Sequence, residues 1–409
     1  MKHFAVNSQE TDRMRISADI DERTLREMYL RAFQRVVTQA RPWTVMCSYN
    51  RLNGVYASQN RWLLTEVLRE EWGFEGLVSD WGAVADRVAA VAAGLDLTMP
   101  GPDDTGDRAL AEAVADGRLD PAALRAAADR VRALVERATE RATEREPGKF
   151  DADAHHARAR EIAARAVVLL KNEGGLLPLS ESQSLAVIGE FARTPRYQGG
   201  GSSHITPTRL DDARTALSES AEVRFGSGYD DIDEAVALAA ESEVALVFVG
   251  SEHETEGADR DSVELPPAHR ELVERVAAAN PRTVVVLSNG AVVLTRPWEA
   301  AVPAIVEGWL LEQAGGSALA DVLFGRTNPS GQLPETIRRG SPTTRPTWTS
   351  PARTGARATG RACTSATAAS TRASRMWPTR SGSGCRTRRS STAPRRRPSR
   401  TPASRSGSR

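Results

Sequence analysis

The stretch GLVSDWG, residues 76–82, is an apolar run that ends in a carboxylate, an indole and a glycine. Residues 61–72, RWLLTEVLREEW, precede it with the apolar period of an amphipathic helix. A helix followed by a short apolar strand is the repeating unit of parallel sheets and (β/α) barrels. Residues at the ends of such strands are where barrels place their catalytic groups. Asp80 is therefore a candidate catalytic residue, and the alternative is that it caps a helix starting near Gly82.

The same alternation continues on both sides of this stretch. VMCSYN (45–50) and LDLTMP (95–100) are further short apolar runs. Helical patterns cover residues 21–40 and 82–93, and a helix-rich region follows at 108–145. Residues 1–145 are thus predicted to form an α/β domain of parallel-sheet or barrel type.

A second series of strands and helices follows a predicted linker at 146–158 and a predicted helix at 159–171. Near-continuous apolar strands are typical of a parallel sheet that helices cover on both faces. A second α/β domain is therefore expected over 159–340. Its expected strands are SLAVIG (184–189), EVALVFVG (243–250), TVVVLSNG (283–290) and AIVEGWL (304–310).

The charge of the chain is divided unevenly along its length. Residues 341–409 contain 16 Arg, no acidic residue and only nine residue types, which leaves 38 basic against 53 acidic residues in 1–340. A segment of such composition cannot build a core and is predicted to be disordered. The acidic body argues against nucleic acid as a partner. No apolar run approaches the ~20 residues of a membrane span, so no membrane partner is expected.

A cluster of carboxylates, SEHETEGADRDSVELP (251–266), directly follows a predicted strand. A solvated acidic loop is one interpretation. A Ca²⁺ site is another, but the spacing lacks the alternating ligands of an EF-hand loop. Two carboxylates on different elements are also what glycoside hydrolysis needs, because one attacks the anomeric carbon and the other protonates the leaving oxygen.

Seven motifs follow one another along the chain. They are KHFAVNSQETDR (2–13), VMCSYNRLNG (45–54), GLVSDWG (76–82), GLDLTMPGP (94–102), VVLLKNEGGLLPL (167–179), QGGGSS (198–203) and ETEGADRDSVELP (254–266). With these motifs in this order, the chain resembles glycoside hydrolase family 3, in its multi-domain β-glucosidase branch. The resemblance implies the C-terminal part of a (β/α)₈ TIM-type barrel, then an α/β sandwich, with the active site between them.

The resemblance also implies roles for individual residues. Asp80 corresponds to the nucleophile and Glu256 to the acid/base, with Glu254 as the rival and Glu252 a weaker candidate. The implied activity is that of a retaining exo-β-glycosidase, with β-glucosidase as the leading interpretation and β-xylosidase as an alternative. The two carboxyl groups are then expected ~5–5.5 Å apart. Glu256 would need a raised pKa, which burial could supply.

Five further residues are implied to bind the substrate, a β-glucoside or short oligosaccharide. Each also has a plainer interpretation: a disordered terminal lysine, a strand tyrosine, core filler or a packing indole. The resemblance implies no cofactor and no metal, and His155 and His156 are expected on a solvated linker. The five substrate-binding residues are Lys2, His3, Met46, Tyr49 and Trp81.

The pattern departs from the family at both ends. The KHF motif lies midway through the family's barrel, so about four of the eight units are expected here and the N-terminus is predicted to be truncated. In another reading frame, residues 362–371 and 376–385 can spell strings that resemble the family's next segment, so residues after about 340 are predicted to be a frameshift product. An inactive fragment or pseudoenzyme, or a protein that binds acidic partners through its basic tail, are the alternatives. The absence of an apolar leader slightly favours the cytoplasm, and no oligomeric state is predicted.

Overall fold

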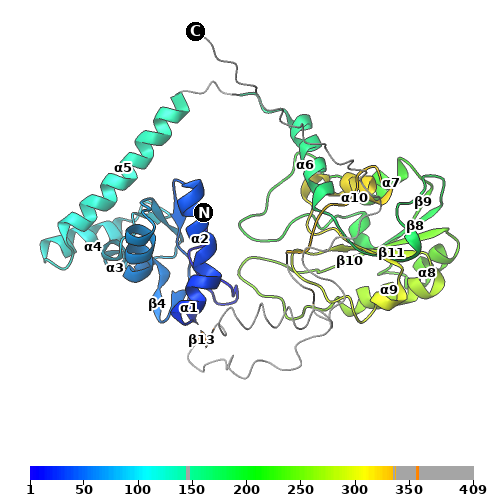
Figure 1. Ribbon diagram of the computed structural model, residues 1–409, viewed down its shortest axis with the longest axis horizontal. Coiled ribbons are helices and arrows are strands. Elements are labelled where there is room, and N and C mark those ends of the chain that lie inside the picture. The colour runs from blue at the N-terminus through cyan, green and yellow to red at the C-terminus, as the bar shows by residue number, and fades with distance from the viewer. Residues whose placement is uncertain (144–147, 335–336, 338–355, 359–409) are drawn as a thin grey trace, which may run out of the picture.

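The computed structural model describes residues 1–143, 148–334, 337 and 356–358. These residues form two parts, which we call the barrel part (1–143) and the sandwich part (148–334). Figure 1 shows the two parts side by side, with loops of the sandwich part reaching toward the barrel part. The predicted frameshifted tail lies outside the described residues, apart from the short strand β13 (Ala356–Ala358).

The barrel part is built on an open parallel sheet. The strands β2 (Val45–Met46), β5 (Leu77–Trp81) and β6 (Leu97–Met99) pair in that order, all parallel. The first residues extend the sheet, because Phe4 forms a parallel bridge with Cys47. The sheet does not close on itself within the described residues, as expected for part of a barrel.

Helices cover the outer side of this sheet with their apolar stripes. Leu63, Leu64, Val67 and Leu68 are fully buried, which is the i, i+1, i+4, i+5 pattern of a helix packed on a sheet. The helical elements are α1 (Glu22–Thr24), η1 (Leu25–Leu30), α2 (Arg31–Arg35), η2 (Val36–Ala40), η3 (Ala57–Gln59), η4 (Trp62–Glu71), α3 (Arg87–Ala93), α4 (Asp104–Ala115) and α5 (Pro121–Thr143).

A second, smaller sheet borders the barrel part. Its order is β13, β1 (Ser17–Asp19), β3 (Arg51–Leu52) and β4 (Val55–Tyr56), with β3 and β4 antiparallel. β1 pairs in parallel with both β3 and β13.

The sandwich part contains a six-stranded sheet in the order β7-β12-β11-β10-β8-β9. All pairs are parallel except β7 with β12, where the chain runs antiparallel at one edge. The strands are β7 (Val168–Asn172), β8 (Leu185–Ile188), β9 (Val223–Gly226), β10 (Val244–Gly250), β11 (Thr283–Ser288) and β12 (Ala304–Glu307).

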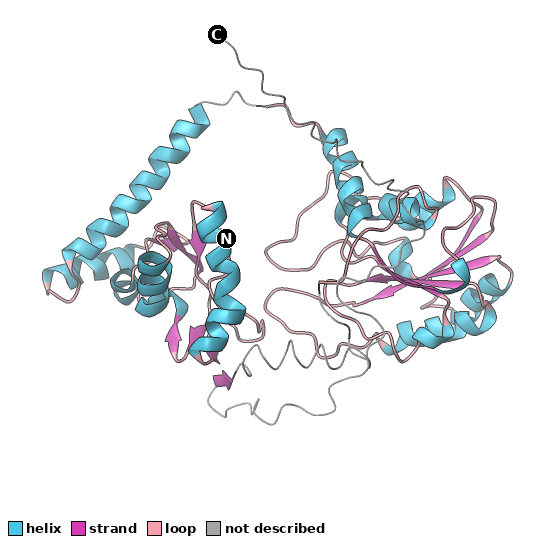
Figure 2. Cartoon of the chain, viewed as in Figure 1, coloured by secondary structure: helices cyan, strands magenta, loops and turns pink. Residues whose placement is uncertain are grey.

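Both faces of this sheet are buried, which explains its uninterrupted apolar strands. Leu246 and Phe248 point into a core with α6 (Ala152–Ala166), α7 (Ala213–Ser218) and α10 (Gly315–Leu323). Val247 and Val249 point into the opposite core with α8 (Ile232–Ala240) and α9 (Pro267–Ala279). Figure 2 shows the helices on either side of the strands. Short helical turns complete the part: η5 (Glu173–Gly175), η6 (Glu190–Ala192), η7 (Glu299–Ala301) and η8 (Glu312–Ala314).

The expected helix at 159–171 is wrong at both ends. α6 starts at Ala152, inside the predicted linker, and ends at Ala166. Val168–Asn172 instead forms the edge strand β7, because the sheet offers β12 as a partner and buries Val168 and Leu169 completely. His156 is likewise buried on α6 rather than solvated. The domain boundaries 1–145, 146–158, 159–340 and 341–409 stay predictions.

Candidate active site

Asp80 lies on β5, one residue before the strand ends, and is buried with 8% of its surface exposed. Its Oδ1 accepts the Trp81 N–H at 2.7 Å. Its Oδ2 lies 3.2 Å from Nε2 of His3 without the alignment of a hydrogen bond, and it is buried with no hydrogen-bond partner among the described residues. Asp80 does not cap the following helix, because α3 is capped by Asp86, which accepts from Ala89 N–H.

The first residues of the chain reach Asp80 because the sheet holds them. Phe4 N–H donates to Met46 O at 2.8 Å, and Ser48 N–H donates to Phe4 O at 2.7 Å. This ladder places His3 beside Asp80 at the carboxyl end of the sheet. Burial lowers the pKa of His3, and the Asp80 carboxylate acts in the opposite direction.

Tyr49 and Arg13 form the next layer of the site. The Arg13 guanidinium carbon lies 4.5 Å from the centre of the Tyr49 ring, a cation–π contact. Burial raises the pKa of Tyr49 to about 12, and the neighbouring Asp80 carboxylate adds to the rise. Tyr49 is therefore a neutral phenol close to Asp80 at neutral pH.

Glu256 belongs to the sandwich part and forms an ion pair with Arg13 of the barrel part. Arg13 Nη2 lies 2.5 Å from Glu256 Oε1. The other carboxylate oxygen accepts from the Ser202 hydroxyl and from Ser202 N–H, the latter at 2.7 Å. The Ser202 hydroxyl, the Arg13 guanidinium and the Ser202 amide lower the pKa of Glu256 to about 2. The expected raised pKa is thus not found, because these donors outweigh burial.

The glycine loop QGGGSS packs directly against Glu256. Gly200 pairs with Thr255: Gly200 N–H donates to Glu254 O at 2.9 Å, and Glu256 N–H donates to Gly200 O at 3.2 Å. Gly201 has φ +100°, and a Cβ there would lie 2.4 Å from Glu256 Cβ. Only glycine fits at this position, so the loop is shaped to Glu256.

Glu254 is held by different partners. One oxygen accepts Gly290 N–H at 2.6 Å and lies 3.3 Å from Arg196, while the other accepts Ala291 N–H at 3.1 Å and lies 3.4 Å from Arg260. Both oxygens are therefore occupied. Glu252 lies two residues earlier in the same loop, with its carboxylate 3.3 Å from Nε2 of the buried His269.

A cavity of about 610 Å³ lies between the two parts. Its lining includes Lys2 and His3 from the barrel part and Glu254 and Glu256 from the sandwich part. Of the other predicted site residues, Asp80 lies 3.2 Å from His3. Met46 is half-buried, Tyr49 is buried, and Trp81 is 59% exposed. The cavity thus brings together residues that are about 250 positions apart in the chain.

Hydrogen bonds from main-chain N–H groups to side-chain carboxylates also join the two parts beside this cavity. The Asp259 carboxylate accepts Glu10 N–H at 3.0 Å and Thr11 N–H at 3.1 Å. Gly257 N–H donates to the Glu10 carboxylate at 2.9 Å. We call this contact the clasp; it consists of Glu10, Thr11 and Arg13 with Glu256, Gly257 and Asp259.

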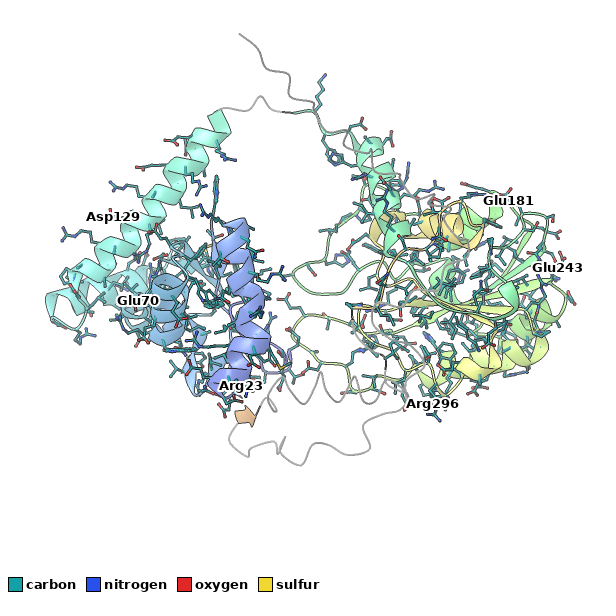
Figure 3. All side chains as sticks on the ribbon, viewed as in Figure 1. Arg23, Glu70, Asp129, Glu181, Glu243 and Arg296 are labelled. Carbon is teal, nitrogen blue, oxygen red and sulfur yellow. The ribbon has the colours of Figure 1, made fainter. Side chains whose placement is uncertain are left out.

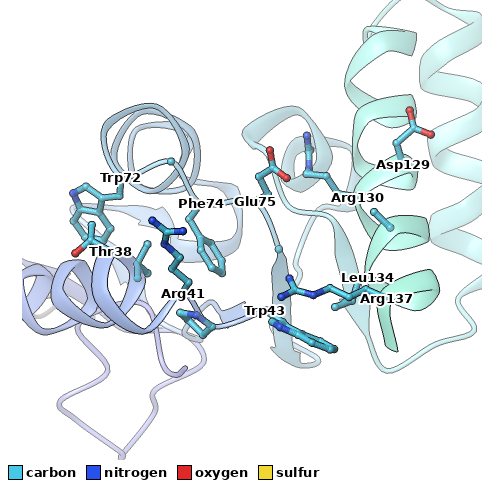
Figure 4. A pocket seen from close by; sticks show the side chains of 15 residues that line it. Thr38, Arg41, Trp43, Trp72, Phe74, Glu75, Asp129, Arg130, Leu134 and Arg137 are labelled. Carbon is cyan, nitrogen blue, oxygen red and sulfur yellow. The ribbon is translucent and has the colours of Figure 1, made fainter. Parts of the chain in front are cut away.

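A second cavity, of about 920 Å³, lies elsewhere. It opens before the start of β2 and β5, where Trp43 lies against Arg137 of α5 (Figure 4). Parallel-sheet enzymes use the opposite, carboxyl end of their strands. The smaller cavity between the parts is therefore the candidate active site.

Comparison with known proteins identifies both parts. The glycosyl hydrolase family 3 N-terminal domain matches residues 1–134, and the family's C-terminal domain matches residues 167–370. The chain belongs to glycosyl hydrolase family 3. The family resemblance and the fold class that the sequence predicted, part of a barrel followed by an α/β sandwich, are confirmed.

Two relatives of the family show the range of activities nearby. An exo-α-(1→6)-L-arabinopyranosidase of Bifidobacterium breve is 48% identical over 359 residues, covering 82% of this chain and 47% of its own. The thermostable β-glucosidase B of Acetivibrio thermocellus is 48% identical over 353 residues, covering 82% of this chain and 46% of its own. The chain therefore spans about half the length of the curated relatives it matches.

The chain also superposes on solved structures of β-glucosidases. The β-glucosidase of Bifidobacterium adolescentis superposes with a TM-score of 0.82 at 47% identity, over 88% of this chain and 54% of that one. β-Glucosidase 3B of Thermotoga neapolitana, solved with glucose, gives a TM-score of 0.79 at 32% identity, over 87% of this chain and 56% of its own.

Several residues of the site were not singled out by the sequence. Arg13, Ser202, Glu10 and Asp259 all lie inside quoted family motifs, but nothing in their spacing says which partner each one meets. Within the described residues, no group of three or more His, Cys, Asp or Glu side chains is arranged to hold a metal ion. No described helix is long and apolar enough to cross a membrane.

Proposed function

We propose that this chain carries the catalytic groups of a retaining exo-β-glycosidase that acts on β-glucosides. One observation carries the proposal: a single cavity is lined by His3, which touches Asp80, and by Glu256 from the other part of the chain. His3 thus connects the Asp80 carboxylate to the space that Glu256 lines from the other part of the chain. Two carboxylates on different elements match the requirement of glycoside hydrolysis.

Asp80 is the nucleophile in this proposal. Its buried Oδ2 has no hydrogen-bond partner among the described residues, so an electron pair is available to attack the anomeric carbon. The attack forms a covalent glycosyl ester and breaks the bond to the leaving oxygen. Neutral Tyr49 and His3 lie close enough to the Asp80 carboxylate to hold it in position while it forms the covalent bond and loses its charge.

Glu256 is the acid/base. It gives its proton to the leaving oxygen in the first step and removes one from the attacking water in the second, so that configuration is retained. Before substrate binds, Ser202 and Arg13 keep Glu256 ionised. Substrate that enters between these groups weakens their contacts with Glu256 and buries it, and both changes favour the protonated form.

The substrate class follows from the relatives. β-Glucosidases make up much of the comparison, which supports a β-glucoside. A relative of equal identity is named for an α-(1→6)-linked L-arabinopyranosyl substrate, so an α-L-arabinopyranoside is the second candidate. β-Xylosides are the third, and an inactive fragment is the alternative to all of them.

Labelling with an activated 2-deoxy-2-fluoro-β-glucoside tests the proposal directly. The fluorine slows hydrolysis of the glycosyl ester, so the ester accumulates and peptide mass mapping locates it. We expect the label on the peptide that contains Asp80, and no label on Asp80→Asn. Asp86→Asn is the matched control, because asparagine caps α3 as aspartate does and labelling should persist. A label on another carboxylate would overturn the assignment of Asp80. Absence of label and of turnover with all three sugars would identify an inactive fragment.

A further inference from the structure

The carboxylate of Glu254 lies two residues before Glu256 and binds donors from two other loops. We propose that Glu254 is a positioning residue: it fixes the loop that presents Glu256 to the cavity and takes no part in proton transfer. The inference rests on the proposed role of Glu256, and it removes the ambiguity between the two neighbouring glutamates.

Both carboxylate oxygens of Glu254 already have partners within the protein, so neither is available to a substrate. Gly290 N–H and Ala291 N–H each donate to one oxygen, at 2.6 and 3.1 Å. A guanidinium flanks each oxygen as well, Arg196 at 3.3 Å and Arg260 at 3.4 Å. The Glu254 side chain is only 13% exposed. Charge-assisted bonds of this kind are strong, so they fix the carboxylate in place.

The two arginines that flank Glu254 also donate hydrogen bonds to main-chain carbonyl oxygens. Arg260 Nη2 donates to Val292 O at 2.6 Å, and Arg196 donates to Glu252 O. Glu254 therefore ties its own loop, 251–266, to the turn at 289–292. Its backbone carbonyl also accepts Gly200 N–H, which adds the glycine loop at 198–203. All three loops surround Glu256.

A buried carboxyl group, that of Glu307, supports the turn at 289–292 from below. Asn289 precedes Gly290, and its amide donates to the fully buried Glu307 at 3.1 Å, while Trp309 N–H donates to the same carboxyl at 2.9 Å. Burial raises the pKa of Glu307 to about 8, so it is neutral at pH 7 and adds no second negative charge beneath Glu254. The turn that receives Glu254 is thus rigidly mounted on β11 and β12.

The consequence for Glu256 is geometric. Without the Glu254 charge, Arg196 and Arg260 lose a shared anion, and the loop no longer holds Glu256 against Ser202 and Arg13. A displacement of about 1 Å of a catalytic group can cost about 100-fold in rate. We expect Glu254→Gln to lower kcat by roughly that factor with little change in KM, because the sugar contacts of the barrel part remain.

The experiment compares four variants: Glu254→Gln, Glu254→Ala, Glu256→Ala and the control Glu252→Gln, which lies on the same loop. Turnover of 2,4-dinitrophenyl β-glucoside is measured with and without azide. Azide displaces Asp80 from the glycosyl ester where a missing acid/base leaves room, and the product is β-glucosyl azide. We expect azide rescue of Glu256→Ala only, and near-normal turnover for Glu252→Gln.

A second readout does not depend on turnover. Titration of the Glu256 carboxyl by ¹³C NMR should show a higher pKa in Glu254→Gln than in the wild type, because the Ser202 and Arg13 contacts loosen. Formation of β-glucosyl azide by Glu254→Ala would overturn the inference, and so would a Glu254→Gln variant that is normal in both readouts. If the wild type neither turns over nor labels, the proposed function fails, whereas an altered Glu256 titration would still support the positioning role.

Discussion

The contact between Arg13 and Glu256 is the second largest cause, after the Ser202 hydroxyl, of the low pKa of the candidate acid/base. It is a charge-assisted bond of 2.5 Å in which Arg13 is 14% and Glu256 28% exposed. Together with Ser202, it stabilises the ionised carboxylate, which is the form needed as a base in the second step of hydrolysis. The first step needs the protonated form, so this contact has to weaken when substrate binds.

Replacement of Arg13 should therefore raise the pKa of Glu256. In Arg13→Gln we expect the pKa of the carboxyl to rise above its wild-type value of about 2, in the direction of an ordinary glutamate, because the positive partner is gone while Ser202 remains. The alkaline limb of the kcat/KM profile should move to higher pH with it. ¹³C NMR titration of the carboxyl measures the shift. Arg15→Gln is the control, since Arg15 is 79% exposed and pairs with Asp12. An unchanged titration in Arg13→Gln would show that Ser202 alone sets the pKa.

Gly201 should be intolerant of any side chain. Its positive φ strains alanine, and the added Cβ would collide with Glu256. We expect Gly201→Ala to lower the free energy of unfolding by more than about 1 kcal/mol and to disturb the Glu256 titration. Gly257→Ala is the matched control, because Gly257 has φ +86° but open space around its Cβ position. Urea denaturation measures both variants. Equal losses in the two would mean that only backbone strain matters, and that the loop is not fitted to Glu256.

The sequence predicts part of this site. Asp80, His3 and Glu256 were predicted from ordered motifs. His3 and Glu256 line one cavity, Asp80 lies 3.2 Å from His3, and the roles of all three stay predictions. The Arg13–Glu256 pair was not predictable, because its members are 243 residues apart and ion pairs leave no periodic signal. Nor was the low pKa of Glu256, which depends on where one hydroxyl and one amide of Ser202 happen to point.

At the scale of elements, the buried parallel strands were the most predictable feature. β8, β10, β11 and β12 all fall inside predicted apolar runs, because burial on both faces leaves few polar positions in them. The buried exceptions are Thr283, Ser288 and Glu307. The run after α6 was misassigned, since a short apolar stretch satisfies a helix or a strand equally well. Only the presence of β12 beside it decides for a strand.

The end of β12 carries a pH-dependent element of stability. The Glu307 carboxyl has a folded pKa of about 8 against an ordinary 4.5. Between these values the unfolded chain releases a proton that the folded chain keeps, so stability falls by about 1.4 kcal/mol per pH unit as pH rises. Gln at position 307 in Glu307→Gln cannot ionise. The free energy of unfolding of this variant, relative to that of the wild type, should therefore increase steadily from pH 5 to pH 8.

Urea denaturation at pH 5, 6.5 and 8 measures this difference. The control is Glu241→Gln, whose side chain is 62% exposed and should give a curve parallel to the wild type. Parallel curves for Glu307→Gln as well would mean that Glu307 is ionised in the folded protein. In that case Asn289 and Trp309 stabilise a buried charge rather than a neutral acid.

At the scale of the whole molecule, the two parts have separate cores and meet through polar groups. The barrel part has its own apolar cluster, and the sandwich part has one on each face of its sheet. Charged residues such as Arg23, Glu70, Asp129, Glu181, Glu243 and Arg296 lie over the outer surfaces of both parts (Figure 3). The relative position of Asp80 and Glu256 therefore depends on the clasp, a link that no composition or period in the sequence reveals.

Removal of the Glu10 and Asp259 carboxylates should loosen the contact between the two parts without unfolding either, although the Arg13–Glu256 pair of the clasp stays. In the double variant Glu10→Ala with Asp259→Ala, Gly257 N–H loses its acceptor, and Glu10 N–H and Thr11 N–H lose theirs. We expect a larger radius of gyration by small-angle X-ray scattering and two resolved thermal transitions, because each core persists by itself. Asp12→Ala with Asp261→Ala is the matched control: it removes two carboxylates from the same two segments but none of the clasp. A radius of gyration equal in wild type, control and clasp variant would show that other contacts hold the parts together.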